Sequence, residues 1–433
     1  MRWLVSIILI LGFAACSVRC SRAQAAEGSP AVASVAGEAI PADVFRVRYI
    51  DYLLKTGLPD APERRRAFLN RLIGIKLIVQ EAAAGGITEE EPYRLEKEIR
   101  YRKLLLDAYA QRMLYDTVQV KQQDLEAMFV RVNTRLTARH LYAPTREQAD
   151  ALYARLQAGA SFAALAREVF ADTALARKGG GIGTFGFDEM DPAFEDAAYA
   201  LGVGETSPPV RTAQGYSIIR LEGRLTRPIL TETEFAQRLD QLERYVRFRK
   251  QEAARAQHVQ DLAATLQVQF HEPGLDRLLA QVTGQALAPD AEARTSWYAT
   301  PLLSFEAAGT GHTWTVEDFD EQVPYTGAAQ RAQVRTRDDL VAFARGLVVR
   351  EAMLTRAEAA GLDRMPAFEQ ALDQVMEDWV YEQAFARLVA ALPAQQDKQG
   401  YLQLHAAALR EQHPVYVYAA VLAAVRLIPN ASS

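Results

Sequence analysis

The segment from Ala138 to Leu221 constrains the fold more than any other part of the chain. It begins with the strand-like run ARHLYAP, which contains His140, and continues through two amphipathic helical stretches. A glycine cluster, KGGGIG, follows, and the segment closes with the alternating run GYSIIRL. Glycine adopts backbone conformations that other residues avoid, so the cluster lets the chain turn tightly between a helix and a strand. This order of elements predicts a small α+β domain over residues 134–225.

Helices are expected on both sides of this segment, and 433 residues are enough for two or three domains. The N-terminal side opens with a strand-like or hairpin run at Val32–Ile40. It continues as helices, of which the one from Phe68 to Val79 is apolar nearly all round and is expected to be buried. The C-terminal side begins with a long amphipathic helix from Thr231 to about Thr265, followed by a short strand at Gln267–Phe270.

The last third of the chain repeats part of the first. Residues 67–87 align with residues 342–362 at a constant offset of 275, including the glycines that end each helix, Gly86 and Gly361. Each stretch follows an Asp-containing helix start and precedes a long charged helix. Chance similarity between two amphipathic helices is the alternative explanation. The joint match of helix, glycine and both flanks favours a second helical domain over residues 272–433 that duplicates the first.

The first residues are expected to be a targeting leader. Arg2 precedes the apolar run Leu4–Ala15, which has the length of a signal-peptide core and is short for a membrane span. Two cleavage patterns remain open. The sequence FAAC ending at Cys16 approximates a lipobox, in which the leader would end at residue 15 and Cys16 would carry lipid. Alternatively, the small-x-small sequence AQA predicts a signal peptide over residues 1–25. Both of these, and an uncleaved anchor, place the body outside the cytoplasm.

Composition excludes several classes of function. Both cysteines, Cys16 and Cys20, lie in the leader, so the body can hold no disulfide and no thiolate nucleophile. The net charge is −5 and acids alternate with bases, so no nucleic-acid partner is expected. The six histidines are scattered, and no HExxH or GxSxG pattern occurs. We therefore expect no metal, no cofactor and no hydrolase site.

Large apolar residues gather after the glycine cluster. Ile182 and Phe185 follow it directly, and Met190 and Phe194 are spaced four apart, so they share one face of a helix. Taken singly, each of these residues could be an ordinary core residue. His140 on its strand could equally be a structural histidine, and a residue such as Asp172 could cap a turn.

The joint order of these residues resembles the parvulin family of peptidyl-prolyl isomerases. The matching features are Arg139-His140, Phe162-Ala163, Asp172, Gly179-Gly180, Met190, Phe194-Glu195, Gly204-Glu205 and Gly215-Tyr216. The resemblance implies a four-stranded antiparallel sheet surrounded by helices, inserted into a mostly helical chaperone domain. It also implies a proline-binding apolar cup formed by Ile182, Phe185, Met190 and Phe194. His140 and Asp172 would form the polar centre, with Thr173 beside Asp172 able to join it.

The closing motif departs from the family pattern. Ser217 stands in Gly215-Tyr216-Ser217-Ile218-Ile219, where the resemblance leads one to expect a second histidine. A serine hydroxyl donates one hydrogen bond and cannot span the distance that an imidazole spans. Isomerisation of an X-Pro bond distorts the amide and transfers no proton, so we expect Ser217 to lower the rate without abolishing peptide binding.

The flanking helices extend the resemblance to secreted foldases of the PrsA and SurA type. In that arrangement residues 31–133 and 226–271 would form the chaperone domain, and residues 134–225 would be the insert. The implied partners are unfolded or nascent secreted polypeptides with X-Pro bonds, in the periplasm, with membrane contact only through a lipid on Cys16. Two interpretations follow: a folding factor that isomerises X-Pro bonds, or a non-catalytic holdase or assembly scaffold that uses a degenerate parvulin unit to bind peptide.

Overall fold

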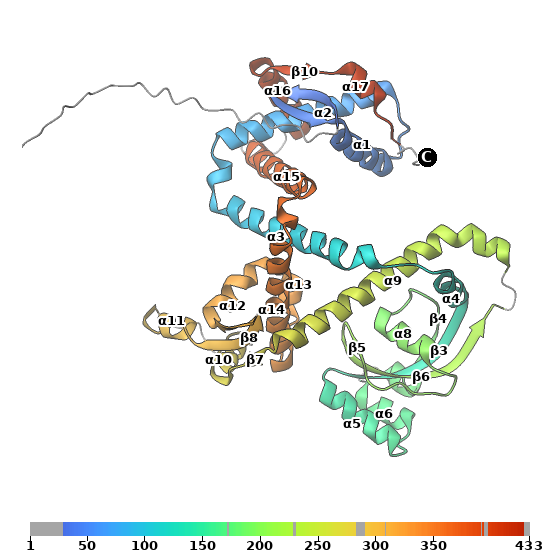
Figure 1. The fold of residues 1–433 in the computed structure, drawn as a ribbon. Helices are drawn as coiled ribbons and strands as arrows, with labels where there is room; N and C mark the ends of the chain where they lie inside the picture. The colour runs from blue at the N-terminus through green and yellow to red at the C-terminus, as the bar shows by residue number, and fades with distance from the viewer. Residues whose placement is uncertain are drawn as a thin grey trace, which may run out of the picture. The chain divides into compact units, whose positions relative to one another are not determined.

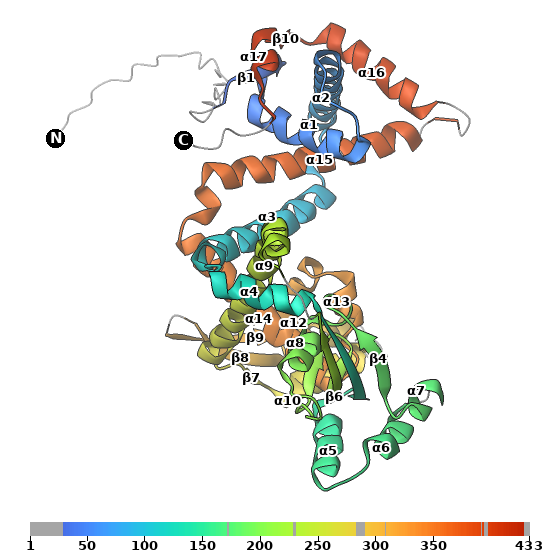
Figure 2. The ribbon, with the colours of Figure 1, turned by 90° about the vertical axis from the view of Figure 1, so that its right-hand side faces the viewer.

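The computed structural model describes residues 29–170, 173–227, 231–282, 291–307, 309–390, 392–393 and 397–427 (Figures 1 and 2). The chain forms two compact units. Unit 1 takes in the described residues of Met1–Ala108, Val316–Leu340 and Arg350–Ser433. Unit 2 takes in those of Tyr109–Thr315 and Val341–Val349. No described helix combines the length and the apolar character that crossing a bilayer requires.

A small sheet in unit 1 joins the two ends of the described chain. β1 (Ala31–Val35) and β2 (Glu38–Pro41) form a hairpin, and β10 (Val415–Val417) pairs antiparallel with the free edge of β1. Ala33 lies opposite Val417, so the pairing joins residues that are almost the whole chain apart. An isolated hairpin is marginally stable in water, and a third strand over an apolar face gives it the stability it lacks.

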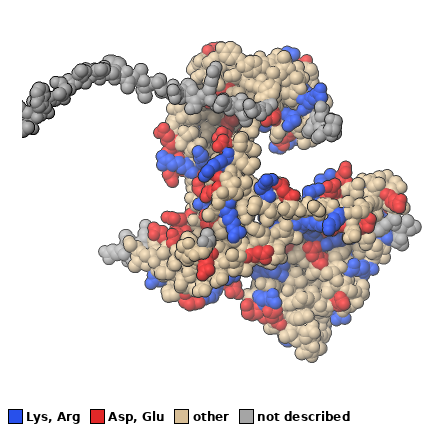
Figure 3. Space-filling view, in the orientation of Figure 1, with Lys and Arg blue, Asp and Glu red and all other residues tan. Residues whose placement is uncertain are grey.

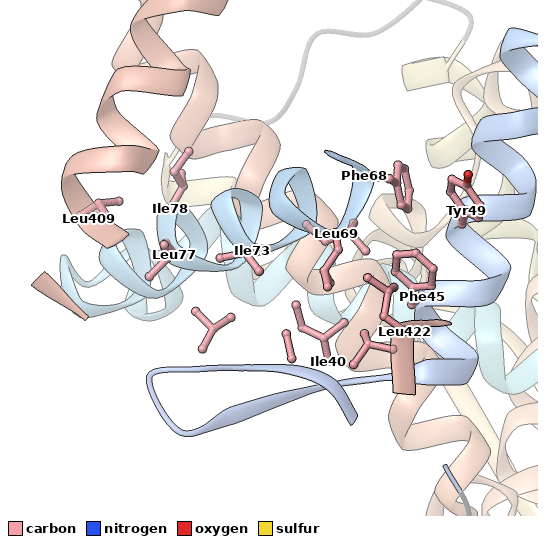
Figure 4. Packing of buried hydrophobic residues seen from close by; sticks show 14 of the residues in the cluster. Ile40, Phe45, Tyr49, Phe68, Leu69, Ile73, Leu77, Ile78, Leu409 and Leu422 are labelled. Atoms are coloured by element: carbon pink, nitrogen blue, oxygen red, sulfur yellow. The ribbon is translucent and has the colours of Figure 1, made fainter. Parts of the chain in front are cut away.

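Helix α2 (Pro62–Ala84) organises the core of unit 1. It packs against α1 (Ala42–Thr56), α15 (Pro366–Ala390) and α16 (Lys398–Gln412), and α17 (Ala419–Ala424) adds apolar residues to the same cluster. Figure 4 shows side chains of the hairpin, of both N-terminal helices and of the C-terminal elements in this cluster; among those labelled are Ile40, Phe45, Tyr49, Phe68, Leu69, Ile73, Leu409 and Leu422.

This packing corrects the expected domain division. Residues 272–433 were expected to form a domain of their own, yet α15, α16 and β10 complete the N-terminal core. The segment 226–271 packs against the last part of residues 31–133: α9 (Glu232–Leu266) contacts α4 (Gln122–Val132), and Nε2 of His258 lies 3.1 Å from the hydroxyl of Tyr109. These elements belong to unit 2, apart from the N-terminal core. The physical reason is that α2 is apolar on nearly every side, so α1 and one hairpin cannot cover it. Remote helices supply the missing surface.

The helices of the two halves follow one another at a fixed offset. α14 (Arg337–Ala359) has the same length as α2, 23 residues, and starts at residue 337 against 62. α15 starts at residue 366, against 91 for α3 (Glu91–Met113). Gly86 and Gly361, which follow α2 and α14, both have left-handed φ, 87° and 69°. Duplication of the first half remains a hypothesis that these matching positions support.

A second small sheet takes its third strand from the other side of residue 272, where the predicted C-terminal region begins. β8 (Pro301–Ala307) and β9 (Thr310–Thr315) form a hairpin, and β7 (Gln269–Phe270), which follows α9 (Glu232–Leu266), pairs with β8. In unit 1 the strand after α16 joins the N-terminal hairpin in the same antiparallel way. The strand just before residue 272, β7, therefore pairs with the hairpin after it, and β10 pairs with the hairpin before it.

The largest sheet lies in unit 2 and has the order β4-β3-β6-β5, with every neighbouring pair antiparallel. Its strands are β3 (Thr134–Ala143), β4 (Gly181–Phe185), β5 (Val210–Thr212) and β6 (Gly215–Thr226). One face packs against α8 (Pro192–Ala200), and the other packs against α5 (Arg146–Gln157) and α6 (Phe162–Val169) (Figures 1 and 2). The predicted α+β class and the four-stranded antiparallel sheet are confirmed.

Two helices carry the chain into and out of this sheet. α4 (Gln122–Val132) precedes β3, and α9 follows β6, and the two helices pack together through a cluster that includes Leu125, Phe129 and Leu242. The remaining helices are α7 (Thr173–Arg177), α10 (Glu272–Val282), α11 (Ala291–Tyr298), α12 (Val316–Gln322) and α13 (Ala328–Ala332).

Charged residues are mixed by sign on the surface. On the face drawn in Figure 3, Lys and Arg lie interspersed with Asp and Glu. Ion pairs one helical turn apart occur as well, as in Glu96–Arg100 and Glu98–Arg102 of α3. The pattern is typical of solvated helix faces.

The shared core of unit 1 leads to a prediction about α16. Leu409 is 5% exposed within the core, whereas Leu404 on the same helix is 74% exposed. Leu409→Ala should lower the free energy of unfolding by about 2–5 kcal/mol, because it leaves a cavity between remote segments. Leu404→Ala should change it by less than about 0.5 kcal/mol. Urea unfolding of the full chain measures both. Equal effects of the two variants would contradict the shared core.

Candidate functional site

The pairing of β3 with β6 brings two of the sequence-predicted residues together. His140 lies opposite Ile219, and Ser217 lies two residues further along β6, so the two side chains are diagonal neighbours on one face. The Nδ1 atom of His140 is 3.4 Å from the Oγ atom of Ser217, which is a long hydrogen bond. Ser217 is buried. Ser217, at the position where the resemblance leads one to expect a second histidine, thus contacts His140 through its hydroxyl group.

Aromatic rings enclose the imidazole of His140. The ring of Phe170 lies 5.3 Å away at a tilted angle, and the ring of Phe194 lies 5.7 Å away, edge to face at 79°. This burial disfavours the charged form and holds the pKa of His140 below its ordinary value of 6.5. At neutral pH the imidazole is therefore uncharged, and it can exchange hydrogen bonds without bringing a cation into the site.

The glycine cluster fixes the backbone beside His140. The amide of His140 donates to the carbonyl oxygen of Gly180 at 2.9 Å. Gly180 has a φ of 81°, and a Cβ atom at this position would lie 2.3 Å from the carbonyl oxygen of His140. Only glycine fits this close approach of two backbones. The cluster that dominates the sequence pattern therefore has a structural cause next to the candidate site.

The four residues of the apolar cup lie together, on the same side of the sheet as His140. Phe185 and Phe194 are 4% and 3% exposed, and their rings lie 6.0 Å apart. Ile182 and Met190 pack against the same cluster and are only partly buried. The two phenylalanines are thus the buried members of this cluster. Ile182 and Met190 are its partly exposed members.

Three of the predicted residues are not placed. Asp172 and Cys16 lie outside the described residues, as does the side chain of Thr173, the first residue of α7. In the part of the chain that the structure describes, no three His, Cys, Asp or Glu side chains come together to hold a metal ion.

Sequence reasoning gave no role to two residues that shape the site: Phe170 was not named, and Glu195 was named only within the family order. Phe170 ends the apolar pattern of α6, which could have marked it as facing the sheet. Glu195 is only 1% exposed, and its Oε1 atom accepts the backbone N–H groups of Glu189 and Met190 at 2.8 and 3.0 Å. A carboxylate inside an apolar helical run, as in PAFEDAAYA, is the signal that could have identified Glu195.

Comparison with known proteins finds a family match over the sheet of unit 2. Residues 128–223 match the family described as Rotamase: PPIC-type PPIASE domain, which is the parvulin type. The foldase protein PrsA of Caldanaerobacter subterraneus is 36% identical over 176 residues, covering 37% of this chain and 57% of that protein. The foldase protein PrsA 2 of Listeria innocua is 33% identical over 141 residues, covering 32% and 46%. The chain thus spans about half the length of these relatives.

Solved structures of similar proteins were also found. One, from a study of PEB4 and Cj1289 as SurA-like chaperones of Campylobacter jejuni, has a TM-score of 0.27 and 24% identity, covering 56% of this chain and 100% of that chain. The parvulin of Nitrosopumilus maritimus has a TM-score of 0.19 and 36% identity, covering 21% and 97%.

The lowered pKa of His140 predicts how stability depends on pH. As the pH falls below 6.5, the unfolded chain takes up a proton at His140 more readily than the folded chain does. Neutral His140 therefore contributes fully to the free energy of unfolding above pH 6.5. This contribution is lost as the pH falls towards the pKa that His140 has in the folded chain. An NMR titration of the imidazole should give a midpoint below 6.5, and His140→Gln should reduce the acid sensitivity of unfolding. A midpoint at or above 6.5 would contradict the burial of the ring.

Proposed function

We propose that the parvulin-type unit of residues 128–223 gives this chain the activity of a folding factor, which binds unfolded or nascent secreted polypeptides and accelerates cis/trans isomerisation of their X-Pro bonds. One observation carries the proposal: the apolar cluster of Phe185 and Phe194, with Ile182 and Met190 partly exposed, lies beside a neutral histidine that aromatic rings enclose. The leader predicted in residues 1–25 supports a periplasmic location, with or without lipid on Cys16.

The chemistry requires no covalent intermediate. Rotation about an X-Pro bond crosses a barrier of roughly 18–20 kcal/mol, because twisting breaks the resonance of the amide. A catalyst lowers this barrier when it binds the twisted amide more tightly than the planar one. Ile182 and Met190 can hold the proline ring away from water. The imidazole of His140 and the hydroxyl of Ser217 can offer hydrogen bonds that match the twisted geometry.

A second function is favoured by the residue at position 217. The hydroxyl of Ser217 is 3.4 Å from His140, and its short side chain leaves the site with a single imidazole. A site of this kind retains the apolar cup and loses part of the polar network. A non-catalytic holdase or assembly scaffold, with the cup as a peptide-docking platform, is therefore the alternative to the enzyme.

The cup leads to a prediction for Met190. Met190→Ala should lower kcat/KM for an X-Pro peptide about tenfold, because a partly exposed apolar contact to the proline ring is lost. Val203→Ala, at a 61% exposed position of the same unit, is the matched control and should leave the rate unchanged. The measurement is a proline-limited refolding or peptide isomerisation assay on the full chain. Equal rates for both variants and the unmodified chain would exclude the cup as the site.

Position 217 separates the two candidate functions. Ser217→His should raise the isomerisation rate several-fold if the site is an impaired enzyme, because it adds a second imidazole next to His140. Ser217→Ala, which removes only the hydroxyl, serves as the control. If the unmodified chain and Ser217→His are both inert while the unmodified chain still suppresses aggregation of an unfolded client, the holdase is the correct function.

A further inference from the structure

Two arginines from the flanking helices meet two neighbouring carboxylates of α8. Arg131 lies in the last turn of α4 and Arg249 lies in α9. The Nη2 atom of each is 2.7 Å from Oδ1 of Asp196 and 3.8 Å from Oε2 of Glu195. Both arginines are mostly buried, with side chains 20% exposed. The two helices that carry the chain into and out of the sheet therefore converge on one pair of acidic residues.

Aromatic rings complete this cluster. The guanidinium groups of Arg131 and Arg249 lie 5.5 and 5.6 Å from the ring of Phe187, and that of Arg131 lies 4.4 Å from the ring of Tyr199. Phe187 also packs edge to face on Tyr245 of α9 at 5.3 Å. These distances are typical of cation–π and aromatic contacts. Phe187, in the loop between β4 and α8, is thus held by residues of both flanking helices.

Glu195 connects this cluster to the apolar cup. Its Oε2 atom faces the arginines, while its Oε1 atom accepts the amides of Glu189 and Met190. The loop that contains these amides includes Asp188 with a φ of 65°, a left-handed conformation that is uncommon outside glycine and that aspartate adopts more readily than most residues. The same loop ends at Met190, the reachable side of the cup. A single buried carboxylate therefore links α9 to the residue that would contact proline.

We propose that Arg131 and Arg249 are positioning residues that hold the loop of residues 186–190 through Glu195, so that helix α9 sets the geometry of the proline cup. The proposal rests on the proposed function for its effect on catalysis. Without Arg249, the carboxylates of Glu195 and Asp196 have only Arg131 as a cation. Their mutual repulsion then weakens the hydrogen bonds from the loop amides to Glu195. Arg249 lies outside residues 128–223, so the family match alone does not include this control of the cup.

The test uses Arg249→Ala in the full chain, with Arg247→Ala as the matched control. Arg247 is on the same helix and pairs with Glu243 on the exposed surface. Amide hydrogen exchange at Glu189 and Met190 should rise about tenfold in Arg249→Ala, because the local opening becomes easier. Exchange at Ile219, whose amide donates to Ser207 at 2.9 Å in the same unit, should stay unchanged.

Kinetics provide the second measurement. Arg249→Ala should raise KM for an X-Pro peptide about three- to tenfold with kcat changed less than about twofold, since the lost placement of Met190 weakens binding. Arg249→Lys, which restores the charge, should recover most of the loss, and Arg247→Ala should have no effect.

The outcomes separate this proposal from the proposed function. If the unmodified chain does not isomerise X-Pro bonds, the proposed function fails, and exchange at Glu189 and Met190 still decides the positioning role. Unchanged exchange at both amides in Arg249→Ala overturns the proposal. A rise in exchange at Ile219 equal to that at Met190 also overturns it, because Arg249 would then stabilise the whole domain and not the loop.

Discussion

The antiparallel pairing of β3 with β6 is the interaction on which the candidate site depends. The ladder runs from Thr134 opposite Thr226 to Ala143 opposite Tyr216 and fixes the face on which every side chain lies. His140 and Ser217 lie on the face of the sheet that packs on α8. Leu141 and Ile218 lie on the opposite face, which packs on α5 and α6. A slip of one residue would send His140 to the opposite face. The site therefore exists only in this register.

The pairing of β10 with β1 explains why unit 1 cannot be divided along the sequence. Each hairpin obtains a third strand from the other side of residue 272: β10 completes the first and β7 completes the second. The helices of the two halves begin at positions separated by the same offset. Both observations are compatible with the predicted duplication, which stays a hypothesis. The core around α2 is built from distant segments of the chain.

Local patterns predicted the elements well because each depends on neighbouring residues. The glycine cluster marked the tight turn that Gly180 makes beside His140, and the four-residue spacing of Met190 and Phe194 marked one face of the cup. The same reasoning placed residues 272–433 in a separate domain. An apolar helix face indicates that the helix is buried, but it does not indicate which segment of the chain covers it. Phe170 and Arg249 were not named for that reason, and Glu195 was given no role: each contacts a partner that its local pattern does not reveal.

The sequence by itself determined the α+β class, the sheet domain with the glycine cluster before β4, and the apolar character of Ile182, Phe185, Met190 and Phe194. These features follow from periodicity and backbone freedom, which are local properties. The tertiary structure decided which strands complete which sheet, and that Ser217 lies beside His140. It also decided that a guanidinium of α9 meets Asp196 from 53 residues away along the chain. Such contacts depend on long-range packing, where many pairings satisfy the same pattern of apolar and charged residues and only the folded chain selects among them.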